Sequence, residues 1–253
     1  MSKNTNKKTA LVTGGSRGIG KAIVARLLAD GLQVIACGRS KAPGDFPEAA
    51  HWIQADVSLP ADAERLLKIT KKELGTIDVL VNDAGVQVER TVLESTDDDW
   101  EAVVGTNCRG VFNLCRAVLP DMETNGGVIV NIGSISGVVA DPGMALYNAS
   151  KAFVHGLTRS IAVDHGPSMR CNVIQPGWIM TAMADDAFAV ANNPQTAKKD
   201  AMARHPAGRF GQPEDIANTV SWLASDDATF VTGQCFTIDG GMTAASPLQP
   251  GLF

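Results

Sequence analysis

The stretch Thr13-Gly14-Gly15-Ser16-Arg17-Gly18-Ile19-Gly20 decides the fold of this chain of 253 residues. It follows a strand-like run at residues 9–13 and leads directly into a segment with helical apolar periodicity at residues 20–30. Its glycines allow a tight turn and close approach of a pyrophosphate, and the helix N-terminus adds oriented N–H groups. Tight turns need glycine anyway, so the motif alone is weak evidence. Its placement between a strand and a helix predicts a dinucleotide-binding turn.

Strand-like runs alternate with helical patterns along the rest of the chain. The other strand candidates are residues 33–37, 52–55, 79–81, 128–132, 171–175 and 235–238. Helical patterns cover residues 60–74, the segment from Ser95 or Thr96 towards Met122, and residues 145–164. This alternation predicts an α/β fold: a Rossmann-type, doubly wound parallel sheet of about seven strands with helices on both faces.

The chain has no internal repeat and no linker rich in proline and glycine, so we expect a single domain over residues 1–253. Residues 181–212 lack strand character and contain two helix-like patches, which predicts a substrate lid within that domain. The link at residues 39–51 is short and leaves little room for a helix. That edge of the site is therefore expected to be open.

Composition and charge exclude several classes of function. Apolar residues make up 45% of the chain and charged residues 19%, as in a globular protein with a sizeable core. A net charge of −5 without a basic run argues against nucleic-acid binding, and no apolar stretch is long enough to cross a membrane. The cysteines form no CxxC and the histidines show no ligand spacing, so we expect core cysteines and no metal site. The polar N-terminus lacks an apolar signal core, which favours a cytoplasmic protein.

The chain contains one tyrosine, Tyr147, and a lysine follows four positions later at Lys151. Positions i and i+4 share a helix face, so the ammonium would lie beside the phenol and favour its ionised form. Ser134 stands thirteen residues before the tyrosine, just after the strand candidate 128–132. A tyrosine and a lysine one turn apart are by themselves usually a surface pair. Joined to the glycine turn, they indicate acid–base chemistry beside a dinucleotide.

The glycine spacing GxxxGxG, followed about 130 residues later by YxxxK, resembles the short-chain dehydrogenase/reductase family. Further matches occur in the family's order: Asp56-Val57, Asn82-Asp83-Ala84-Gly85, Asn107, Ser134, Pro176-Gly177-Trp178-Ile179-Met180-Thr181, Thr232-Gly233-Gln234 and Asp239-Gly240-Gly241. The resemblance covers roughly residues 8–243. Asp83 departs from the pattern, because the family has a second asparagine there.

The resemblance implies hydride transfer between a nicotinamide and a carbonyl or carbinol carbon. Tyr147 would supply the proton, and Ser134 would give the substrate oxygen a second hydrogen bond. Lys151 would assist Tyr147 and bind the ribose hydroxyls, while Asn107 would hold a water of a proton relay. The cofactor-binding residues that the resemblance implies are Gly14, Ser16, Arg17, Gly18, Ile19, Gly20, Arg39, Ser40, Asp56, Val57, Asn82, Ala84, Gly85, Tyr147, Lys151, Pro176, Gly177, Ile179 and Thr181.

The end of the second strand bears on the choice between NAD and NADP. Family members that prefer NAD have an aspartate where this chain has Gly38, and here Arg39 follows directly. Arg17 adds a second cation within the glycine turn. Guanidinium groups attract the 2′-phosphate of NADP, whereas a carboxylate binds the free ribose hydroxyls of NAD. Two arginines and no acid predict NADP(H), with plain surface charge as the alternative.

Substrate contacts are expected from residues 87–90, residues 138–144 and the lid. The apolar candidates in and around these segments are Val138, Val139, Met144, Trp178, Met180, Met183 and Phe188. They favour a small or medium apolar carbonyl or alcohol as substrate. The alternatives are a β-ketoacyl thioester reductase, a lyase or epimerase, and a non-catalytic nucleotide-sensing regulator on the same fold. The resemblance also implies a homotetramer, and the tail at residues 246–253 would either pack on a neighbouring subunit or fray.

Overall fold

Seven parallel strands form one sheet in the computed structural model, which describes residues 7–189 and 191–246. The order across the sheet is β3-β2-β1-β4-β5-β6-β7. The strands are β1 (Thr9–Thr13), β2 (Gln33–Gly38), β3 (His51–Gln54), β4 (Val79–Asn82), β5 (Val128–Ile132), β6 (Arg170–Pro176) and β7 (Cys235–Ile238). The predicted doubly wound sheet is confirmed, and each strand candidate differs from its strand by at most one residue at either end.

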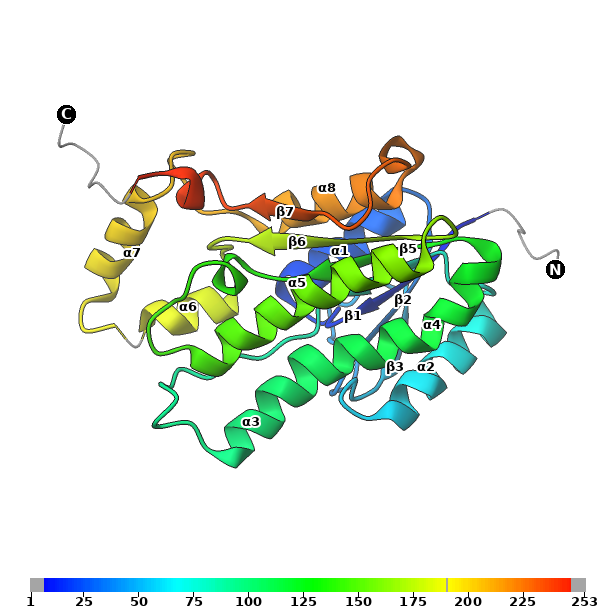
Figure 1. Ribbon diagram of the computed structural model, residues 1–253, viewed down its shortest axis with the longest axis horizontal. Helices are drawn as coiled ribbons and strands as arrows, with labels where there is room; N and C mark the ends of the chain where they lie inside the picture. Colours follow the sequence, from blue (N-terminus) through cyan, green and yellow to red (C-terminus); the bar gives the residue numbers. More distant parts are fainter. Residues whose placement is uncertain (1–6, 190, 247–253) are drawn as a thin grey trace.

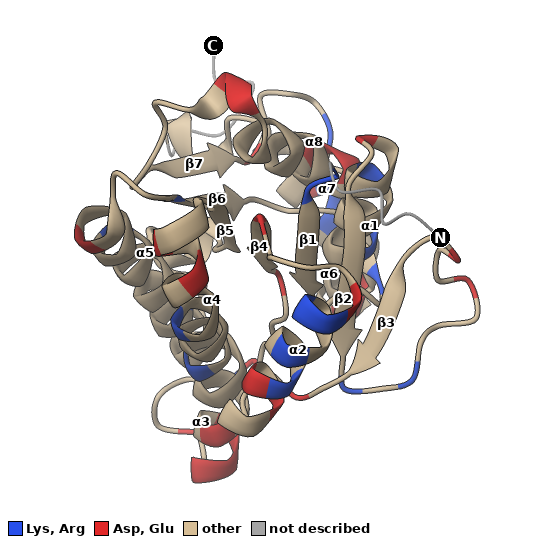
Figure 2. Ribbon diagram, turned by 90° about the vertical axis from the view of Figure 1, so that its right-hand side faces the viewer, with Lys and Arg blue, Asp and Glu red and all other residues tan. Residues whose placement is uncertain are grey.

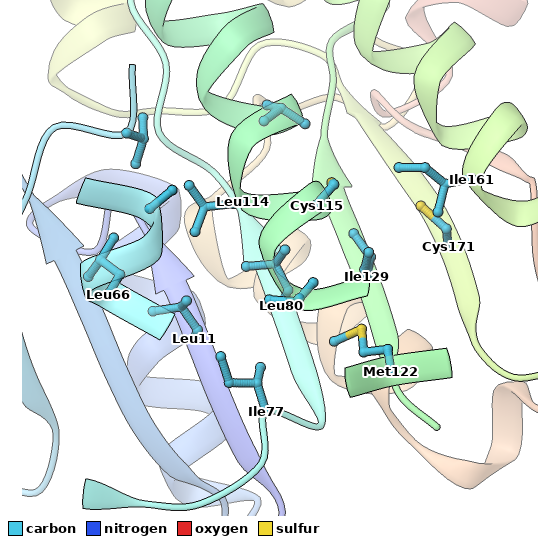
Figure 3. Packing of buried hydrophobic residues seen from close by; sticks show 14 of the residues in the cluster. Leu11, Leu66, Ile77, Leu80, Leu114, Cys115, Met122, Ile129, Ile161 and Cys171 are labelled. Carbon is cyan, nitrogen blue, oxygen red and sulfur yellow. The ribbon is translucent and has the colours of Figure 1, made fainter. Parts of the chain in front are cut away.

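Helices cover both faces of this sheet (Figures 1 and 2). The helices α1 (Gly18–Ala29) and α8 (Pro213–Ala224) pack on one face, where Ile23, Leu27, Ile216 and Val220 are fully buried. The helices α2 (Pro60–Glu73), α4 (Val111–Asn125) and α5 (Ala145–His165) pack on the other. Fully buried leucine and isoleucine side chains of α2 and α4 meet those of β1, β4 and β5 there (Figure 3).

The cysteines belong mainly to this core. Cys115 of α4 and Cys171 of β6 lie among the core side chains in Figure 3, and Cys37 and Cys108 are also buried. Burial raises the pKa of the Cys115 thiol to about 12, which keeps it protonated. The prediction of small core cysteines is confirmed for these four, whereas Cys235 is half-buried.

The predicted long helix after residue 95 is present but contains a π-helical turn. It begins with α3 (Asp97–Val104), where Thr96 and Asp99 form a capping box. The π turn at Gly105–Gly110 follows, and α4 continues from it. A Cβ at Gly110 would lie 2.6 Å from Val57 Cγ2, so a glycine there lets the helix approach the loop after β3. The sequence periodicity indicated the helix and gave no sign of the wider turn, which contains Asn107.

The topology places a binding crevice between β1 and β4. These strands are neighbours in the sheet. After β1 the chain continues to β2 on one side, and after β4 it continues to β5 on the other side. Ligands of open α/β sheets bind where the strand order reverses in this way. Thr13 ties the two strand ends together, because its Oγ1 accepts the backbone N–H groups of Asp83 and Ala84, each at 3.1 Å.

The predicted lid consists of two helices, α6 (Ala182–Ala189) and α7 (Pro194–Ala203). They lie at the end of the sheet towards which β6 and β7 point (Figure 1). The two ends of the segment meet at a bridge between Ile179 and Gly211, with Met180 N–H donating to Gly211 O. The chain therefore leaves the rest of the domain and rejoins it at the same place, and both helices lie between these two points.

Three further predictions concern other segments. The described residues of the link 39–50 contain no helix, as expected. Residues 247–253 of the proposed tail contact lie outside the described part of the chain. No helix within the described residues is long and apolar enough to span a membrane.

Candidate active site

A continuous cleft runs along the carboxyl ends of the strands. Its walls come from the loops after β1, β2, β3, β4, β5 and β6, together with the start of α5 and of α6. Most residues implied by the family resemblance line it: Gly14, Ser16, Arg17, Gly18, Ile19, Arg39, Asp56, Val57, Ala84, Gly85, Ser134, Tyr147, Lys151, Pro176, Gly177, Ile179 and Thr181. Residues scattered over the sequence thus share one surface.

Four implied residues lie outside the cleft lining. Gly20 lies under the turn, and Ser40 is exposed on the link after β2, where its carbonyl accepts Trp52 Nε1–H at 3.1 Å. The Nδ2 of Asn82 donates to Asn131 Oδ1 at 2.9 Å and so joins β4 to β5 inside the protein. Asn107 is buried beside the cleft. Three of these residues shape the walls from behind, whereas Ser40 faces solvent.

The glycine turn holds its shape through contacts that only glycine permits. Gly14 has a φ of +72°, and a Cβ there would lie 2.8 Å from Ala84 N. A Cβ at Gly20 would lie 2.3 Å from Gly14 O. The N-cap of α1, Arg17, makes no side-chain hydrogen bond to the first turn of the helix. The first N–H groups of α1 are therefore turned towards the cleft without a side-chain cap, which suits an anionic group.

Tyr147, Lys151 and Ser134 lie together at the end of the cleft beside β5 and α5. We call it the reaction end, after the roles that the family resemblance implies for these residues. Lys151 Nζ lies 5.5 Å from the centre of the Tyr147 ring and donates to Ile132 O at 3.0 Å. Lys151 is 6% exposed and Ser134 8%, whereas Tyr147 is half-buried and faces the cleft. The predicted helix-face pairing of the phenol and the ammonium is present.

Asn107 braces the helix that carries the tyrosine. Its Nδ2 donates to Val86 O at 2.8 Å and to Ser150 Oγ at 3.0 Å, and its Oδ1 accepts Val86 N–H at 2.9 Å. Ser150 Oγ in turn donates to Tyr147 O at 2.8 Å. Both amide protons are therefore in use, so a relay water would need Oδ1 or a backbone carbonyl of the π turn.

His155 packs behind the loop that contains Ser134. A Cβ at Gly133 would lie 2.4 Å from His155 Nε2, and one at Gly137 would lie 2.4 Å from Cε1. Burial lowers the pKa of His155 to about 4, so the ring is neutral near pH 7. Gln175 Nε2 lies 3.1 Å from the ring Nδ1 and fixes its orientation. A rigid, uncharged support thus stands behind the reaction end.

Two exposed arginines lie at the end of the cleft beside β2. We call it the adenosine end, because the family resemblance implies that the adenosine binds there. Arg17 and Arg39 both line the cleft, and neither has a side-chain ion pair or hydrogen bond within residues 7–189 and 191–246. Trp52 packs against Gly38, where a Cβ would lie 3.0 Å from the ring. A glycine at this position therefore leaves space for the indole, and no carboxylate occupies it.

Comparisons with known proteins agree with this geometry. A family model described as "Enoyl-(Acyl carrier protein) reductase" matches residues 14–243. The chain is 37% identical over 245 residues to the 3-oxoacyl-(acyl-carrier-protein) reductase FabG of Thermotoga maritima, an alignment that covers 93% of this chain and 97% of that protein. It is 39% identical over 251 residues to 2-(R)-hydroxypropyl-CoM dehydrogenase of Xanthobacter autotrophicus, with 94% and 99% covered. The solved structure of ligand-free aldohexose dehydrogenase from Thermoplasma acidophilum matches with a TM-score of 0.90 at 32% identity, over 98% of each chain.

The chain belongs to the short-chain dehydrogenase/reductase family. It is an oxidoreductase of this family, whose oxidoreductases use nicotinamide cofactors. The cleft fits such a group, because a Cβ at Gly14 or Gly20 would break the turn that leaves room for a pyrophosphate. Within the described residues, no cluster of three or more His, Cys, Asp and Glu side chains could hold a metal ion.

Asp83 is where this chain departs from the family's asparagine. Its carboxyl points under the glycine turn, with Oδ2 placed 2.6 Å from the Cβ that Gly20 lacks. Burial raises the pKa of Asp83 to about 7, against the opposing effects of the Lys151 ammonium and of a hydrogen bond from Gly20 N–H. The residue as a whole is half-buried because its other side lines the cleft.

The substrate side of the cleft is less apolar than the sequence suggested. Met144, Trp178 and Met183 line it, as expected. Phe188 does not, because it is buried within the predicted lid segment, stacked on Trp178 with ring centres 4.7 Å apart. The side chains of Val138, Val139 and Met180 also lie outside the lining, and Val138 is 68% exposed.

Sequence reasoning missed two polar residues beside Ser134. Ser136 and Asp141 both line the cleft, and Ser136 Oγ donates to Asp141 Oδ2 at 2.6 Å. Ser136 stands two residues after Ser134 in the turn that follows β5. Its closeness to Ser134 in the sequence could therefore have predicted its place in the cleft. Nothing in the sequence pattern singled out Asp141, which belongs to an irregular loop.

Proposed function

We propose that this protein is an NADP(H)-dependent carbonyl reductase or alcohol dehydrogenase that acts on a small or medium apolar substrate. The observation that supports it is one continuous cleft with Tyr147, Ser134 and Lys151 at one end and Arg17 and Arg39 at the other. A dinucleotide lying along the glycine turn would reach both ends.

Tyr147 acts as the proton donor in reduction and as the proton acceptor in oxidation. When bound, the nicotinamide supplies or accepts the hydride at its C4. Negative charge then develops on the substrate oxygen, and groups already in position stabilise it best. The Tyr147 hydroxyl gives its proton to that oxygen, while Ser134 donates a hydrogen bond to it.

Lys151 is fixed in position and still has donors to spare. An ammonium has three protons, and Ile132 O accepts one of them. The other two are free to hold the ribose hydroxyls. The Lys151 ammonium lies 5.5 Å from the centre of the Tyr147 ring, so the nicotinamide ribose and the phenol would meet at the same end of the cleft.

NADP(H) is the better fit at the adenosine end. Arg17 and Arg39 are exposed cations in the cleft wall, and the backbone at Gly38 presents no acid. A 2′-phosphate between two guanidinium groups gains charge-assisted hydrogen bonds, which a free ribose hydroxyl does not.

The nearest alternative is a β-ketoacyl thioester reductase, which the similarity to FabG favours. A pantetheine-carrying substrate would need cations at the mouth of the cleft, and the candidates are Arg90, Arg109, Arg204 and Arg209. Arg90 is paired with Asp99 at 2.7 Å and Arg209 with Asp215 at 2.7 Å. Arg109 and Arg204 are the exposed candidates that form no ion pair with the described residues.

The family resemblance supports a homotetramer, and so does the surface of the long helices. Trp100, Phe112 and Phe153 are 53%, 42% and 42% exposed on α3, α4 and α5. Large apolar side chains exposed on adjacent helices are typical of subunit interfaces. We therefore place the subunit contacts of the proposed tetramer on these helices.

A substrate panel tests the proposal. Cyclohexanone, acetophenone and acetoacetyl-CoA are incubated with NADPH and with NADH, and cyclohexanol and glucose are incubated with NADP+ and with NAD+. Loss or formation of reduced nicotinamide is followed by absorbance. We expect turnover of a simple ketone, faster with NADPH than with NADH by about tenfold or more at low cofactor concentration. Turnover of acetoacetyl-CoA alone would favour the thioester reductase, and exclusive use of NADH would refute the role of the arginines.

A further inference from the structure

An acid that the mechanism above does not use lies at the reaction end of the cleft. Asp141 Oδ2 accepts the Ser136 hydroxyl proton at 2.6 Å, and Ser136 Oγ lies 3.0 Å from Ser134 Oγ. All three residues line the cleft, and Asp141 is half-buried there. The carboxylate is therefore two hydrogen-bond lengths from the group that would hold the substrate oxygen.

The fold, and not a counter-ion, holds this carboxylate in place. Asn148, next to Tyr147 in α5, donates from Nδ2 to Asp141 O at 3.0 Å. Pro142 follows directly and restricts the backbone of the residue before it. In the part of the chain that the structure describes, Asp141 forms no ion pair, and Ser136 is the only donor to its side chain. The acid thus combines a fixed position with lone pairs that no protein group uses.

Such a carboxylate discriminates between substrates that bring a donor and substrates that do not. A carboxylate accepts up to about four hydrogen bonds and donates none. A substrate that covers it with C–H groups removes water from it and gives no hydrogen bond in return, which costs binding free energy. A substrate hydroxyl in the same place gains a charge-assisted hydrogen bond. Isolated polar groups in mainly apolar sites select and orient ligands in this way.

The surrounding residues narrow the kind of donor. Met144, Trp178 and Met183 line the substrate side, so the body of the ligand is expected to be apolar. The Lys151 ammonium lies at the same end and disfavours a second cation, so a neutral hydroxyl fits better than an ammonium group. In an α-hydroxyketone the hydroxyl and the carbonyl are on adjacent carbons. Its carbonyl oxygen can therefore meet Ser134 while its hydroxyl meets Asp141.

We propose that Asp141 determines substrate specificity by binding a hydroxyl group on the carbon next to the one that exchanges hydride. The preferred substrates are then α-hydroxyketones, and vicinal diols in the reverse direction, on an otherwise apolar body. This inference rests on the proposed function and narrows it. The reaction is unchanged: the hydride goes to the carbonyl carbon and the Tyr147 proton to the carbonyl oxygen. The neighbouring hydroxyl keeps its own proton and only donates a hydrogen bond to Asp141.

Three ketones that share one ring test the role of the hydroxyl. Reduction of 2-hydroxycyclohexanone, 2-methoxycyclohexanone and cyclohexanone by NADPH is followed by absorbance. The methoxy compound is the matched control, because it keeps the electron-withdrawing oxygen beside the carbonyl but has no proton to donate. For the wild type we expect kcat/KM to be about ten- to hundredfold higher for the hydroxyketone than for the methoxyketone, as for a hydrogen bond to a charged group.

Two variants test the role of Asp141. Asp141→Ala should bring the ratio of hydroxyketone to methoxyketone close to one by slowing the hydroxyketone, and kcat/KM for cyclohexanone should not fall. Asp141→Asn keeps the shape and can form only a neutral hydrogen bond, so its ratio should lie between, at about two- to tenfold. The dissociation constant of NADPH should be unchanged in both variants, which checks that the cleft is intact. Asp141→Asn alone decides the matter if the alanine variant does not fold.

The outcomes separate this inference from the proposed function. If the wild type reduces none of the three ketones, the proposed function fails. If it reduces cyclohexanone but shows equal kcat/KM for the hydroxyketone and the methoxyketone, or a ratio that Asp141→Ala leaves unmoved, only the inference about Asp141 fails. Losses of equal size with all three ketones would show that Asp141 supports the site as a whole, and would also overturn it.

Discussion

The two ends of the cleft are built differently. At the reaction end, Ser134 and Lys151 are buried, and their polar atoms are held by Ser136 and by Ile132 O. At the adenosine end, Arg17 and Arg39 are exposed and form no ion pair with the described residues. Buried and pre-oriented groups need little reorganisation during a reaction, whereas exposed cations select a ligand by its charge. We infer that the reaction end governs turnover and the adenosine end governs the choice of cofactor.

Removing the phenol tests the reaction end and has the largest expected effect. Tyr147→Phe should lower kcat by about 10²- to 10⁴-fold, because the proton donor is lost while the ring remains. The dissociation constant of NADPH, measured by fluorescence titration, should be unchanged. Turnover within about tenfold of wild type would contradict the role of Tyr147.

A methyl group in the glycine turn should disturb both ends together. Gly14→Ala places a Cβ 2.8 Å from Ala84 N in a left-handed conformation, so we expect a loss of about 2–4 kcal/mol in stability and loss of NADPH binding. The matched control is Gly75→Ala, where φ is +97° and no atom lies within 4 Å of the added Cβ. It should lose only about 1 kcal/mol in chemical denaturation and bind NADPH normally. Equal losses in the two variants would show that contact with Ala84 is unimportant.

Removing one cation tests the adenosine end. Arg39→Ala should weaken NADPH binding by about tenfold, because a charge-assisted hydrogen bond to the 2′-phosphate is lost, and should leave NADH binding and kcat unchanged. Arg109→Ala, an exposed arginine outside the cleft lining, is the control and should bind both cofactors as the wild type does. If Arg39→Ala lowered kcat with saturating NADPH, the proposed separation between the two ends would not hold.

Asp83 lies between the two ends of the cleft, with its carboxyl under the glycine turn. Its replacement by the family's asparagine should have the smallest effect of these four variants on activity. Because burial raises its pKa to about 7, the folded protein keeps the Asp83 proton between about pH 4 and 7, where the unfolded chain has lost it. The free energy of unfolding from this group therefore falls as pH rises through that window. Asp83→Asn should gain stability relative to wild type by about 1–2 kcal/mol on going from pH 5 to pH 8, measured by denaturation at equal protein concentration. A stability difference that is the same at both pH values would mean that Asp83 ionises as an ordinary aspartate.

Local patterns predicted the parts of the site that depend on neighbouring residues in the chain. The turn between β1 and α1 and the pairing of Tyr147 with Lys151 follow from glycine spacing and from helical periodicity. The parallel sheet with helices on both faces followed from the alternation of strands with helices, whereas the order of the strands across it was not predicted. These features are set by short-range geometry, which a single sequence contains.

Contacts made by loops were beyond such reasoning. Asp141 reaches Ser136 from an irregular loop, and Phe188 turns into the lid instead of the cleft. Both outcomes depend on how distant segments pack. The π turn at Asn107 is similar, because it is associated with the close approach of Gly110 to Val57 in the loop between β3 and α2.

Transfer of isotope from the cofactor tests the central claim most directly. The wild type is incubated with a ketone from the panel and NADPH that carries deuterium at the transferred C4 position. The account predicts that deuterium appears on the carbinol carbon of the alcohol in proportion to the NADPH consumed, and that Tyr147→Phe forms almost none. Oxidation of NADPH without deuterium in the alcohol, or with deuterium released to water, would contradict it.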